Sequence, residues 1–357
     1  MRLNLRSGNE DQKIEYTGTN RVALSIKNIW KSYGDKAVLH GVDVDVPEHS
    51  FVSIIGESGS GKTSILKIIA GLEKPDKGQI YVDSNAIVDD KVFLKPEKRG
   101  MGMVFQEYTL FPHMTIKENI LYGVKGSQQK KNDVLEEMMN LIKLNDLLDK
   151  YPHMISGGQQ QRAAIARALA PKPRFLLLDE PFSNLDQKTR KILSEEFFTL
   201  LKKEGITAVL VTHDQDEAFT YSDIIVILKD GLIEQTGKSE EVYHYPKSEW
   251  VADFLGNANF IPLNSSRPNC FLKQITEVCA ICGNSNNIMI RPEDITVTKG
   301  SDDYSHGKIE KIEFRGSYYL ASVRLVGGEL LKINLQKNHS HQVNEEVLIS
   351  ASSYHVF

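Results

Sequence analysis

Residues 56–63 read GESGSGKT, and side chains of these types at this spacing can bind the phosphates of a nucleotide. Glycines let such a loop curl until its backbone N–H groups point at phosphate oxygens, and a following helix adds the positive end of its dipole. Lys62 is expected to hold the β- and γ-phosphates, and Thr63 offers a hydroxyl to Mg²⁺. The expected nucleotide ligands of this segment are Gly56, Ser58, Gly59, Ser60, Gly61, Lys62, Thr63 and Ser64. A chance glycine turn is the alternative, and the apolar run FVSII before the loop and the helical pattern SILKIIAGL after it argue against that.

Two adjacent carboxylates, Asp179 and Glu180, follow the apolar run FLLL. When strands alternate with helices along the chain, the sheet binds ligands at the C-terminal ends of its strands, so these acids are expected at such an edge. Asp179 suits Mg²⁺, directly or through water, and Glu180 could polarise a water for in-line attack on the γ-phosphate. His213, after the run TAVLVT, could hydrogen-bond the same phosphate. Taken alone, the acids could equally cap a helix or turn, and the histidine could cap the surface.

A second helix start of the anion-binding kind lies at residues 155–162, ISGGQQQR. Ser156 can cap this helix while the amides of Gly157 and Gly158 stay open to phosphate, and Gln159 belongs to the same predicted group. The alternative is simply a capped helix. Since one phosphate loop already serves one nucleotide, a second phosphate-binding segment indicates a site that another copy of the chain completes.

Strands and helices that alternate along the chain are needed to bring these candidate site residues together. Strand-like patterns run from Val22 and through AVLHGVDVDV, and two antiparallel strands are expected to flank the buried run FVSII. Three later apolar strands, FLLL, TAVLVT and IIVIL, are separated by helical patterns, which predicts a mostly parallel sheet. Residues 130–170 instead show a helical period throughout and predict a helical insertion.

After Tyr245 the pattern changes to short alternating strands, such as Lys308–Phe314, Ala321–Val326 and Leu331–Leu335. We therefore expect a small β domain at the C-terminal end, joined by a linker near residues 245–264. Residues 1–20 are polar and without period, and they predict a flexible extension with no visible function.

The composition is that of a folded globular protein of 357 residues, long enough for two or more domains. A net charge of −4 argues against a chain that mainly coats nucleic acid. The apolar runs are shorter than a spanning helix requires and the first residues lack a signal-peptide core, so a cytoplasmic location is expected. The three cysteines, Cys270, Cys279 and Cys282, favour buried thiols over a metal site or a regulatory redox pair.

The motifs together resemble the ATP-hydrolysing subunit of an ATP-binding cassette (ABC) transporter, from about Val22 to Gly237 and in the order of that family. ISGGQQQR resembles the family signature, with Ile155 where Leu is usual. VFQEYTLFPHMTIKENI resembles the glutamine loop, which implies that Gln106 lies at Mg²⁺ and the attacking water. SNLD, residues 183–186, resembles the loop that crosses between subunits, VTHDQDEA carries the switch histidine, and Tyr33 matches the aromatic residue that stacks on adenine.

The remainder resembles the OB-like domain of importers for iron, spermidine, sulfate, molybdate and maltose, through NNIMIRPEDITVT and GKIEKIEFRGSYYLASVRL. The resemblance implies an α/β fold of the P-loop NTPase class over residues 22–245, with an N-terminal extension over 1–21. It implies a helical subdomain at about 107–170 and an OB-like β-barrel over 246–357. WVADFLGNANFIP, residues 250–262, resembles a phrase of iron importers, so ferric iron is the first expected solute. Putrescine or spermidine comes next, and thiamine or a phosphonate is an alternative.

The same resemblance implies ATP and Mg²⁺ as cofactors, a homodimer, two membrane permease subunits and an extracytoplasmic solute-binding protein. It places the chain on the cytoplasmic side of the inner membrane, with no nucleic acid as partner. The apolar cluster in residues 105–113, which includes Phe111, is expected to dock on the permease, local packing being the alternative. A soluble cassette ATPase without a permease is a less favoured function, because one phosphate loop and no long heptad run are present. A nucleotide kinase would leave the ISGGQ segment unexplained.

Overall fold

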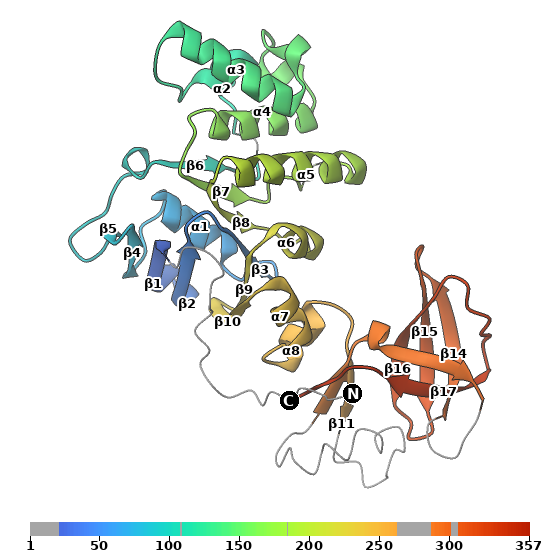
Figure 1. Cartoon of the computed structure of the whole chain (residues 1–357). Coiled ribbons are helices and arrows are strands. Elements are labelled where there is room, and N and C mark those ends of the chain that lie inside the picture. Colours follow the sequence, from blue (N-terminus) through green and yellow to red (C-terminus); the bar gives the residue numbers. More distant parts are fainter. Residues whose placement is uncertain (1–20, 108, 184, 263–286, 301–305) are drawn as a thin grey trace. The chain divides into compact units, whose positions relative to one another are not determined.

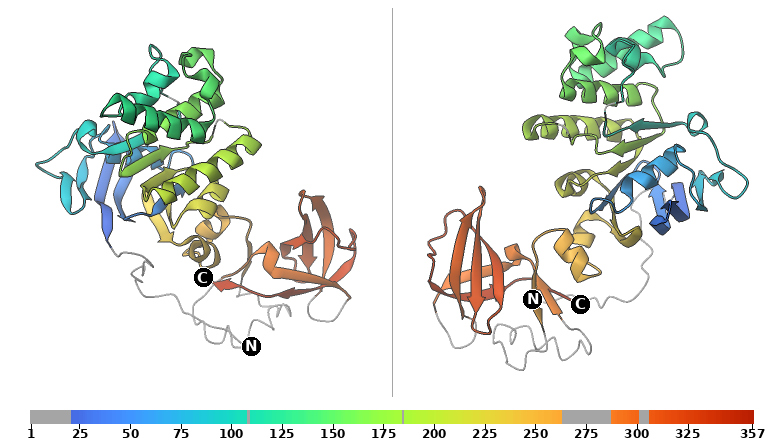
Figure 2. Two further views of the ribbon diagram at one scale, coloured as in Figure 1. Left: turned by 45° about the horizontal axis from the view of Figure 1, so that its top comes forward. Right: turned by 180° about the vertical axis from the view of Figure 1, so that it is seen from behind.

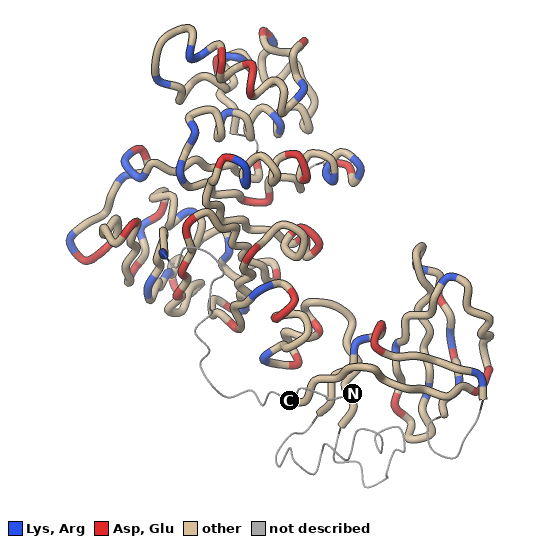
Figure 3. Tube along the Cα trace, in the orientation of Figure 1, with Lys and Arg blue, Asp and Glu red and all other residues tan. Residues whose placement is uncertain are grey.

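The computed structural model describes residues 21–107, 109–183, 185–262, 287–300 and 306–357. The chain divides into two compact units, Met1–Ser239 and Glu240–Phe357 (Figure 1). The predicted N-terminal extension and the three cysteines lie outside the described residues. Along the trace, Lys and Arg are interspersed with Asp and Glu in both units (Figure 3).

A six-stranded sheet in the order β10-β9-β3-β8-β7-β6 forms the centre of the first unit. Its strands β9, β3, β8, β7 and β6 pair in parallel, whereas β10 pairs with β9 antiparallel. Every residue of β3, β7 and β8 is buried, as expected for parallel strands that are covered on both faces. The strands are β3 (Phe51–Gly56), β6 (Met101–Val104), β7 (Phe175–Asp179), β8 (Thr207–Val211), β9 (Ile224–Lys229) and β10 (Leu232–Gly237). The mostly parallel sheet is confirmed.

The expectation that two antiparallel strands flank β3 is wrong. These strands, β1 (Val22–Tyr33) and β2 (Lys36–Pro47), pair with each other in a separate sheet of order β2-β1-β4-β5, completed by β4 (Lys77–Val82) and β5 (Asn85–Val88). The two sides of β3 are taken instead by β8 and β9. The physical reason is burial: β1 and β2 alternate buried and more exposed residues, whereas β3 is apolar on both faces.

The helices of this unit fall into two groups. Beside the sheets lie α1 (Lys62–Ala70), α5 (Gln187–Lys203) and α6 (Gln215–Tyr221). At one end, α2 (Ile116–Leu121), α3 (Gln128–Ile142) and α4 (Gly157–Leu169) pack against one another within the expected helical insertion (Figures 1 and 2). Short 3₁₀ turns span Pro96–Lys98, Asn145–Leu147 and Pro152–Met154. Val134, Met138 and Ile142 of α3 are buried at helical spacing, so the same face that predicts the helix also packs it.

Arg99 fixes the C-terminal end of α1. Its Nη1 donates to the carbonyl oxygens of Ile68 and Ile69 in the last turn of the helix, each at 2.8 Å, and the Ile68 carbonyl oxygen also accepts from the Gly71 N–H at 3.1 Å. Gly71 allows the approach, because a Cβ there would lie 2.5 Å from Arg99 Nε and its φ is +81°. Burial lowers the pKa of Arg99 to about 10.

The second unit begins with two short helices, α7 (Ser239–His244) and α8 (Glu249–Phe254). Helix α8 lies in the region that the sequence predicts as a linker, where the Ser248 side chain caps it through the Val251 N–H at 3.3 Å and Val251 and Ala252 are buried. Arg291, itself buried, donates to carbonyl oxygens of Tyr243, Ala252, Gly256 and Asn257. It also lies 4.1 Å from the centre of the Tyr243 ring, and burial and Glu293 raise the pKa of Tyr243 to about 12.

Two antiparallel sheets make up the rest of this unit. One has the order β11-β12-β18 and the other β13-β17-β14-β15-β16, around a core that includes Ile309, Val323 and Ile333. The strands are β11 (Asn259–Pro262), β12 (Asn287–Ile290), β13 (Ile295–Lys299), β14 (His306–Phe314), β15 (Tyr319–Leu325), β16 (Leu330–Leu335), β17 (Glu346–Ala351) and β18 (His355–Val356), with a 3₁₀ turn at Pro292–Asp294. The predicted C-terminal β domain is confirmed. Within the described ranges of both units, no helix combines the length and apolar character needed to cross a bilayer.

Candidate functional site

The loop between β3 and α1 has the backbone geometry that the GESGSGKT pattern predicts. Gly59 and Gly61 have φ of +84° and +105°, values that residues with a Cβ rarely adopt. Gly56 meets β9 so closely that a Cβ would lie 2.1 Å from the Leu228 carbonyl oxygen. The glycines are therefore required by shape, and Ser58 and Gly59 at the tip of the loop are exposed.

Lys62 and Ser60 face inward from this loop. Lys62 is 7% exposed, and its Nζ donates to the carbonyl oxygens of Gly56 at 2.9 Å and Glu57 at 2.8 Å. Burial lowers the pKa of Lys62, against the opposing effect of the Asp179 and Glu180 carboxylates. An ammonium held against backbone carbonyls is ready to exchange those acceptors for phosphate oxygens.

Thr63 and Asp179 form an oxygen-rich pair beside the loop. The Thr63 hydroxyl donates to Asp179 Oδ1 at 3.1 Å, and Asp179 is 4% exposed. Burial raises the pKa of Asp179, while the Thr63 hydrogen bond lowers it. A buried carboxylate beside a hydroxyl is a donor set that suits a hard divalent cation such as Mg²⁺.

Glu180, Gln106 and His213 meet at one edge of the central sheet. Gln106 Nε2 donates to Glu180 Oε2 at 2.9 Å, and His213 Nδ1 lies 3.1 Å from Glu180 Oε1. They follow the carboxyl ends of β6, β7 and β8, which are neighbours in the sheet, so strand order alone brings the three side chains together. Glu180 has a φ of +47° and its N–H donates to the Val211 carbonyl at 2.8 Å.

Tyr33 ends β1 with its hydroxyl directed at α1 and the loop that follows. It shares a 3.1 Å hydrogen bond with Ser64 Oγ and donates a short hydrogen bond to the Glu73 carboxylate. Lys31 Nζ lies 5.2 Å from the ring centre. Burial and Glu73 raise the pKa of Tyr33. Sequence reasoning missed Glu73, since nothing in its local pattern marks it.

Ser156 and Gln159 begin α4 and close a reciprocal capping box. The Gln159 side chain accepts from the Ser156 N–H at 2.9 Å, and Ser156 Oγ accepts from the Gln159 N–H at 3.4 Å. A Cβ at Gly158 would lie 3.0 Å from Leu185 Cδ2, a tight contact that the leucine side chain would have to relieve. This segment, with Gly157, belongs to the α2–α4 group and not to the loop before α1 (Figure 1).

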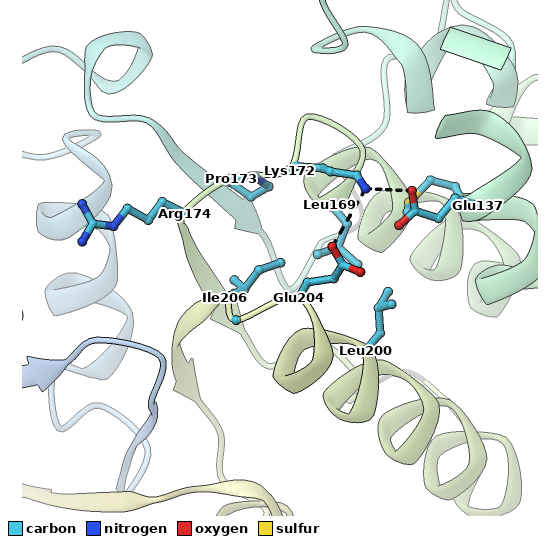
Figure 4. Close-up of a pocket in the computed structure, with 10 residues that line it drawn as sticks. Glu137, Leu169, Lys172, Pro173, Arg174, Leu200, Glu204 and Ile206 are labelled. Atoms are coloured by element: carbon cyan, nitrogen blue, oxygen red, sulfur yellow. Dashed lines mark ion pairs between the residues drawn. The ribbon is translucent and has the colours of Figure 1, made fainter. Parts of the chain in front are cut away.

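A cavity of about 230 Å³ lies elsewhere in the first unit (Figure 4). Lys172 Nζ spans it between Glu137 Oε2 at 3.0 Å and Glu204 Oε2 at 3.9 Å. The predicted site residues are absent from its lining, which consists of Glu137, Met138, Leu169, Lys172, Pro173, Arg174, Leu200, Glu204, Gly205 and Ile206. The Lys172 ammonium attracts a carboxylate of α3 and one at the end of α5, so this cavity marks a structural contact between the two helices.

The arrangement as a whole is that of a P-loop nucleoside triphosphatase, with a phosphate loop, a carboxylate pair and two polar side chains at one sheet edge. Residues 39–183 match the family described as ABC transporter, and residues 288–357 match the TOBE domain. Among solved structures, the ATP-binding cassette MJ0796, in a dimeric post-hydrolysis state bound to ADP and Pi, has a TM-score of 0.55 and 36% sequence identity. The match covers 60% of this chain and 98% of that one.

Similar proteins extend over nearly the full length. A sulfate/thiosulfate import ATP-binding protein of Synechocystis sp. is 38% identical, over 90% of this chain and 90% of its own. A spermidine/putrescine import ATP-binding protein of Marinobacter nauticus is 39% identical over 85% of each chain. An Fe(3+) ions import ATP-binding protein of Photorhabdus laumondii is 37% identical, over 88% of this chain and 90% of its own. The chain therefore belongs to the ABC transporter family, among its ATP-hydrolysing import subunits with a C-terminal TOBE domain.

Proposed function

We propose that this subunit hydrolyses ATP with Glu180 as the group that orients and polarises the attacking water. The carrying observation is the contact of Glu180 with both Gln106 and His213 at the sheet edge. The loop amides and Lys62 hold the β- and γ-phosphates, Gln106 positions the water, and His213 hydrogen-bonds the γ-phosphate. When bound, Mg²⁺ supplies charge compensation at the phosphates, and Thr63, Asp179 and Gln106 are the residues that would hold it.

The adenine base is proposed to stack on the ring of Tyr33, a residue at the end of β1 that is 43% exposed. Ser64 lies beside the Tyr33 hydroxyl and contributes a phosphate contact from the first turn of α1. With these roles, the base lies at the end of β1 and the phosphates lie at the loop before α1, and Ser64 connects the two parts of the site.

Two copies of the chain are proposed to complete each other's sites. Ser156, Gly157, Gly158 and Gln159 form a helix start on the α2–α4 group, away from the phosphate loop of the same chain. The dimeric form of MJ0796 supports this arrangement. Each ATP would then lie between the phosphate loop of one copy and the Ser156 segment of its partner.

Coupling to transport is proposed to run through the exposed aromatic side chains of the helical group. Tyr122 is 63% exposed, its ring lies 4.7 Å from that of Phe111, and Arg167 lies 5.1 Å from the Phe111 ring centre. Phe111 is thus partly packed, and Tyr122 offers the more open surface. Two membrane permease subunits are the proposed partners, with a solute-binding protein outside the membrane and this chain on the cytoplasmic side.

Ferric iron is the proposed solute, supported by residues 250–262 and by Fe(3+) ions import ATP-binding proteins among the similar sequences. The test is uptake of radiolabelled ferric iron, spermidine and sulfate in cells with the gene deleted and restored. Restored iron uptake alone supports the proposal, and it must fail with Glu180→Gln. Restored uptake of spermidine or sulfate would assign that solute instead of iron, and the proposal that this subunit hydrolyses ATP would still stand.

A further inference from the structure

Arg190, in the first turn of α5, contacts two segments, one that follows β7 and one that follows β8. Its Nη2 donates to the carbonyl oxygens of Ser183 and Leu185, each at 3.2 Å. Its Nη1 forms an ion pair with Asp214 Oδ2 at 3.2 Å. One guanidinium therefore joins the turn after β7 to the start of α6.

Both contacts lead back to Glu180. The Ser183 N–H and hydroxyl donate to the Glu180 carbonyl oxygen at 3.3 and 3.1 Å. Asp214 directly follows His213, whose Nδ1 lies 3.1 Å from Glu180 Oε1. Arg190 thus closes a ring of contacts around Glu180 without touching its side chain.

Glu180 needs such support, because its φ of +47° lies in a region that residues with a side chain occupy at a cost. The turn that follows must hold this conformation if the carboxylate is to keep its place. Asp214 in turn caps α6 through the Glu217 N–H at 3.2 Å, so the ion pair with Arg190 also fixes the start of that helix.

We infer that Arg190 is a positioning residue for ATP hydrolysis, which holds the backbone of Glu180 and the segment of His213 in register. This inference rests on the proposed role of Glu180. A planar fork of donors is needed, since one cation must reach two carbonyls and a carboxylate at once. Lysine can keep the ion pair but has no rigid fork for both carbonyls.

The experiment compares ATP turnover, KM for ATP and Tm of the full chain with those of Arg190→Ala and Arg190→Lys. We expect kcat to fall about 10- to 100-fold in Arg190→Ala, the scale of a displacement of roughly 1 Å at a reacting group. KM should stay within about threefold of wild type, because phosphate and base contacts are untouched. Arg190→Lys should recover part of the turnover. Arg174→Ala, which also loses ion pairs, to Asp83 and Glu48, is the matched control and should keep its kcat.

A second arm separates positioning from folding. In a Glu180→Gln background, Arg190→Ala should lower the residual rate by a smaller factor than in the wild type, since the Glu180 carboxylate is already gone and only the placement of His213 can still be lost. Wild-type kcat in both Arg190 variants, or an equal loss in the Glu180→Gln background, would overturn the inference. Should Arg190→Ala unfold, Arg190→Lys at unchanged Tm carries the test. Normal turnover of Glu180→Gln alone would instead contradict the proposed function.

Discussion

The side-chain amide of Gln106 donates a hydrogen bond to the Glu180 carboxylate across 2.9 Å, although the two residues are 74 positions apart in the chain. The contact exists because β6 and β7 are parallel neighbours, so the residues after them emerge at the same edge. His213 approaches the other carboxylate oxygen from the end of β8. Glu180 is thus contacted by residues that follow both strands next to β7.

Glu180→Gln is expected to keep the binding of Mg²⁺ and ATP and to lower turnover by about 10²- to 10⁴-fold, the usual contribution of a general base. The glutamine side chain can keep the shape of the site but cannot accept a proton from water. Phosphate release and the affinity for a fluorescent ATP analogue measure the two properties. Glu137→Gln, in the cavity of Figure 4, is the control and should turn over normally. Near-wild-type phosphate release from Glu180→Gln would assign the water to another group.

Tyr33→Phe and Glu73→Ala are expected to raise KM for ATP by a similar small factor, with kcat unchanged. Both remove the Tyr33–Glu73 hydrogen bond, so the double variant should be no worse than Tyr33→Phe, which also loses the hydrogen bond with Ser64. Tyr33→Ala also loses the ring and should be more affected, because stacking on a base contributes about 1–3 kcal/mol. Steady-state kinetics with ATP measures all four proteins. Additive effects of Tyr33→Phe and Glu73→Ala would show that the two side chains act separately.

Asp179→Asn is expected to abolish the thermal stabilisation by Mg²⁺ and ATP while leaving the nucleotide-free protein as stable as wild type or more so. The pKa of Asp179 is raised in the folded protein, so between the ordinary and the raised pKa the folded chain binds a proton that the unfolded chain has lost. Its contribution to stability therefore decreases as the pH rises through the window between the ordinary and the raised pKa. The difference in Tm between variant and wild type, followed from pH 7 downward without Mg²⁺, should shrink. A difference in Tm that does not change with pH would show that ionisation of Asp179 does not affect stability.

Tyr122→Asp is expected to abolish copurification with the permease subunits while ATP turnover of the isolated chain is unchanged. The residue is 63% exposed, so a carboxylate there meets water in the free subunit and an apolar surface in the complex. Lys125→Asp, on the same exposed segment, tests whether charge alone is responsible. Retention of the intact complex by Tyr122→Asp would place the dock elsewhere.

Lys62→Ala and Ser156→Arg are each expected to inactivate the homodimer, and a mixed dimer of the two is expected to regain part of the activity. In the mixed dimer both defects fall in one composite site, so the second site is built from native residues. Differently tagged subunits, purified as heterodimers, are assayed for phosphate release beside each parent. If each site were complete within one chain, both subunits would keep their own defect and no activity would return.

Local chemistry made the phosphate loop predictable from the sequence, because GESGSGKT carries its glycines, lysine and threonine in one short segment. The meeting of Gln106, Glu180 and His213 depends on strand order, which is set by long-range packing. The ends of apolar strands already point to Glu180 and His213 in the sequence, whereas only the family resemblance points to Gln106. The partners Glu73 and Arg190 were missed for the same reason. Arg190 lies four residues after the cap Asp186, a spacing that by itself indicates only a helix face.

The buried guanidinium of Arg291 sets the N-terminal limit of a stable C-terminal fragment. Its acceptors lie in residues 243–257, which precede β12 and the later strands in the chain. A fragment that starts at Asn287 would bury a cation after deleting the carbonyls that compensate it, and it should aggregate. A fragment that starts at Glu240 keeps them and is the piece to graft onto another transporter's ATPase. The short helices α7 and α8 therefore belong with the two C-terminal sheets in one module that has to be moved as a unit.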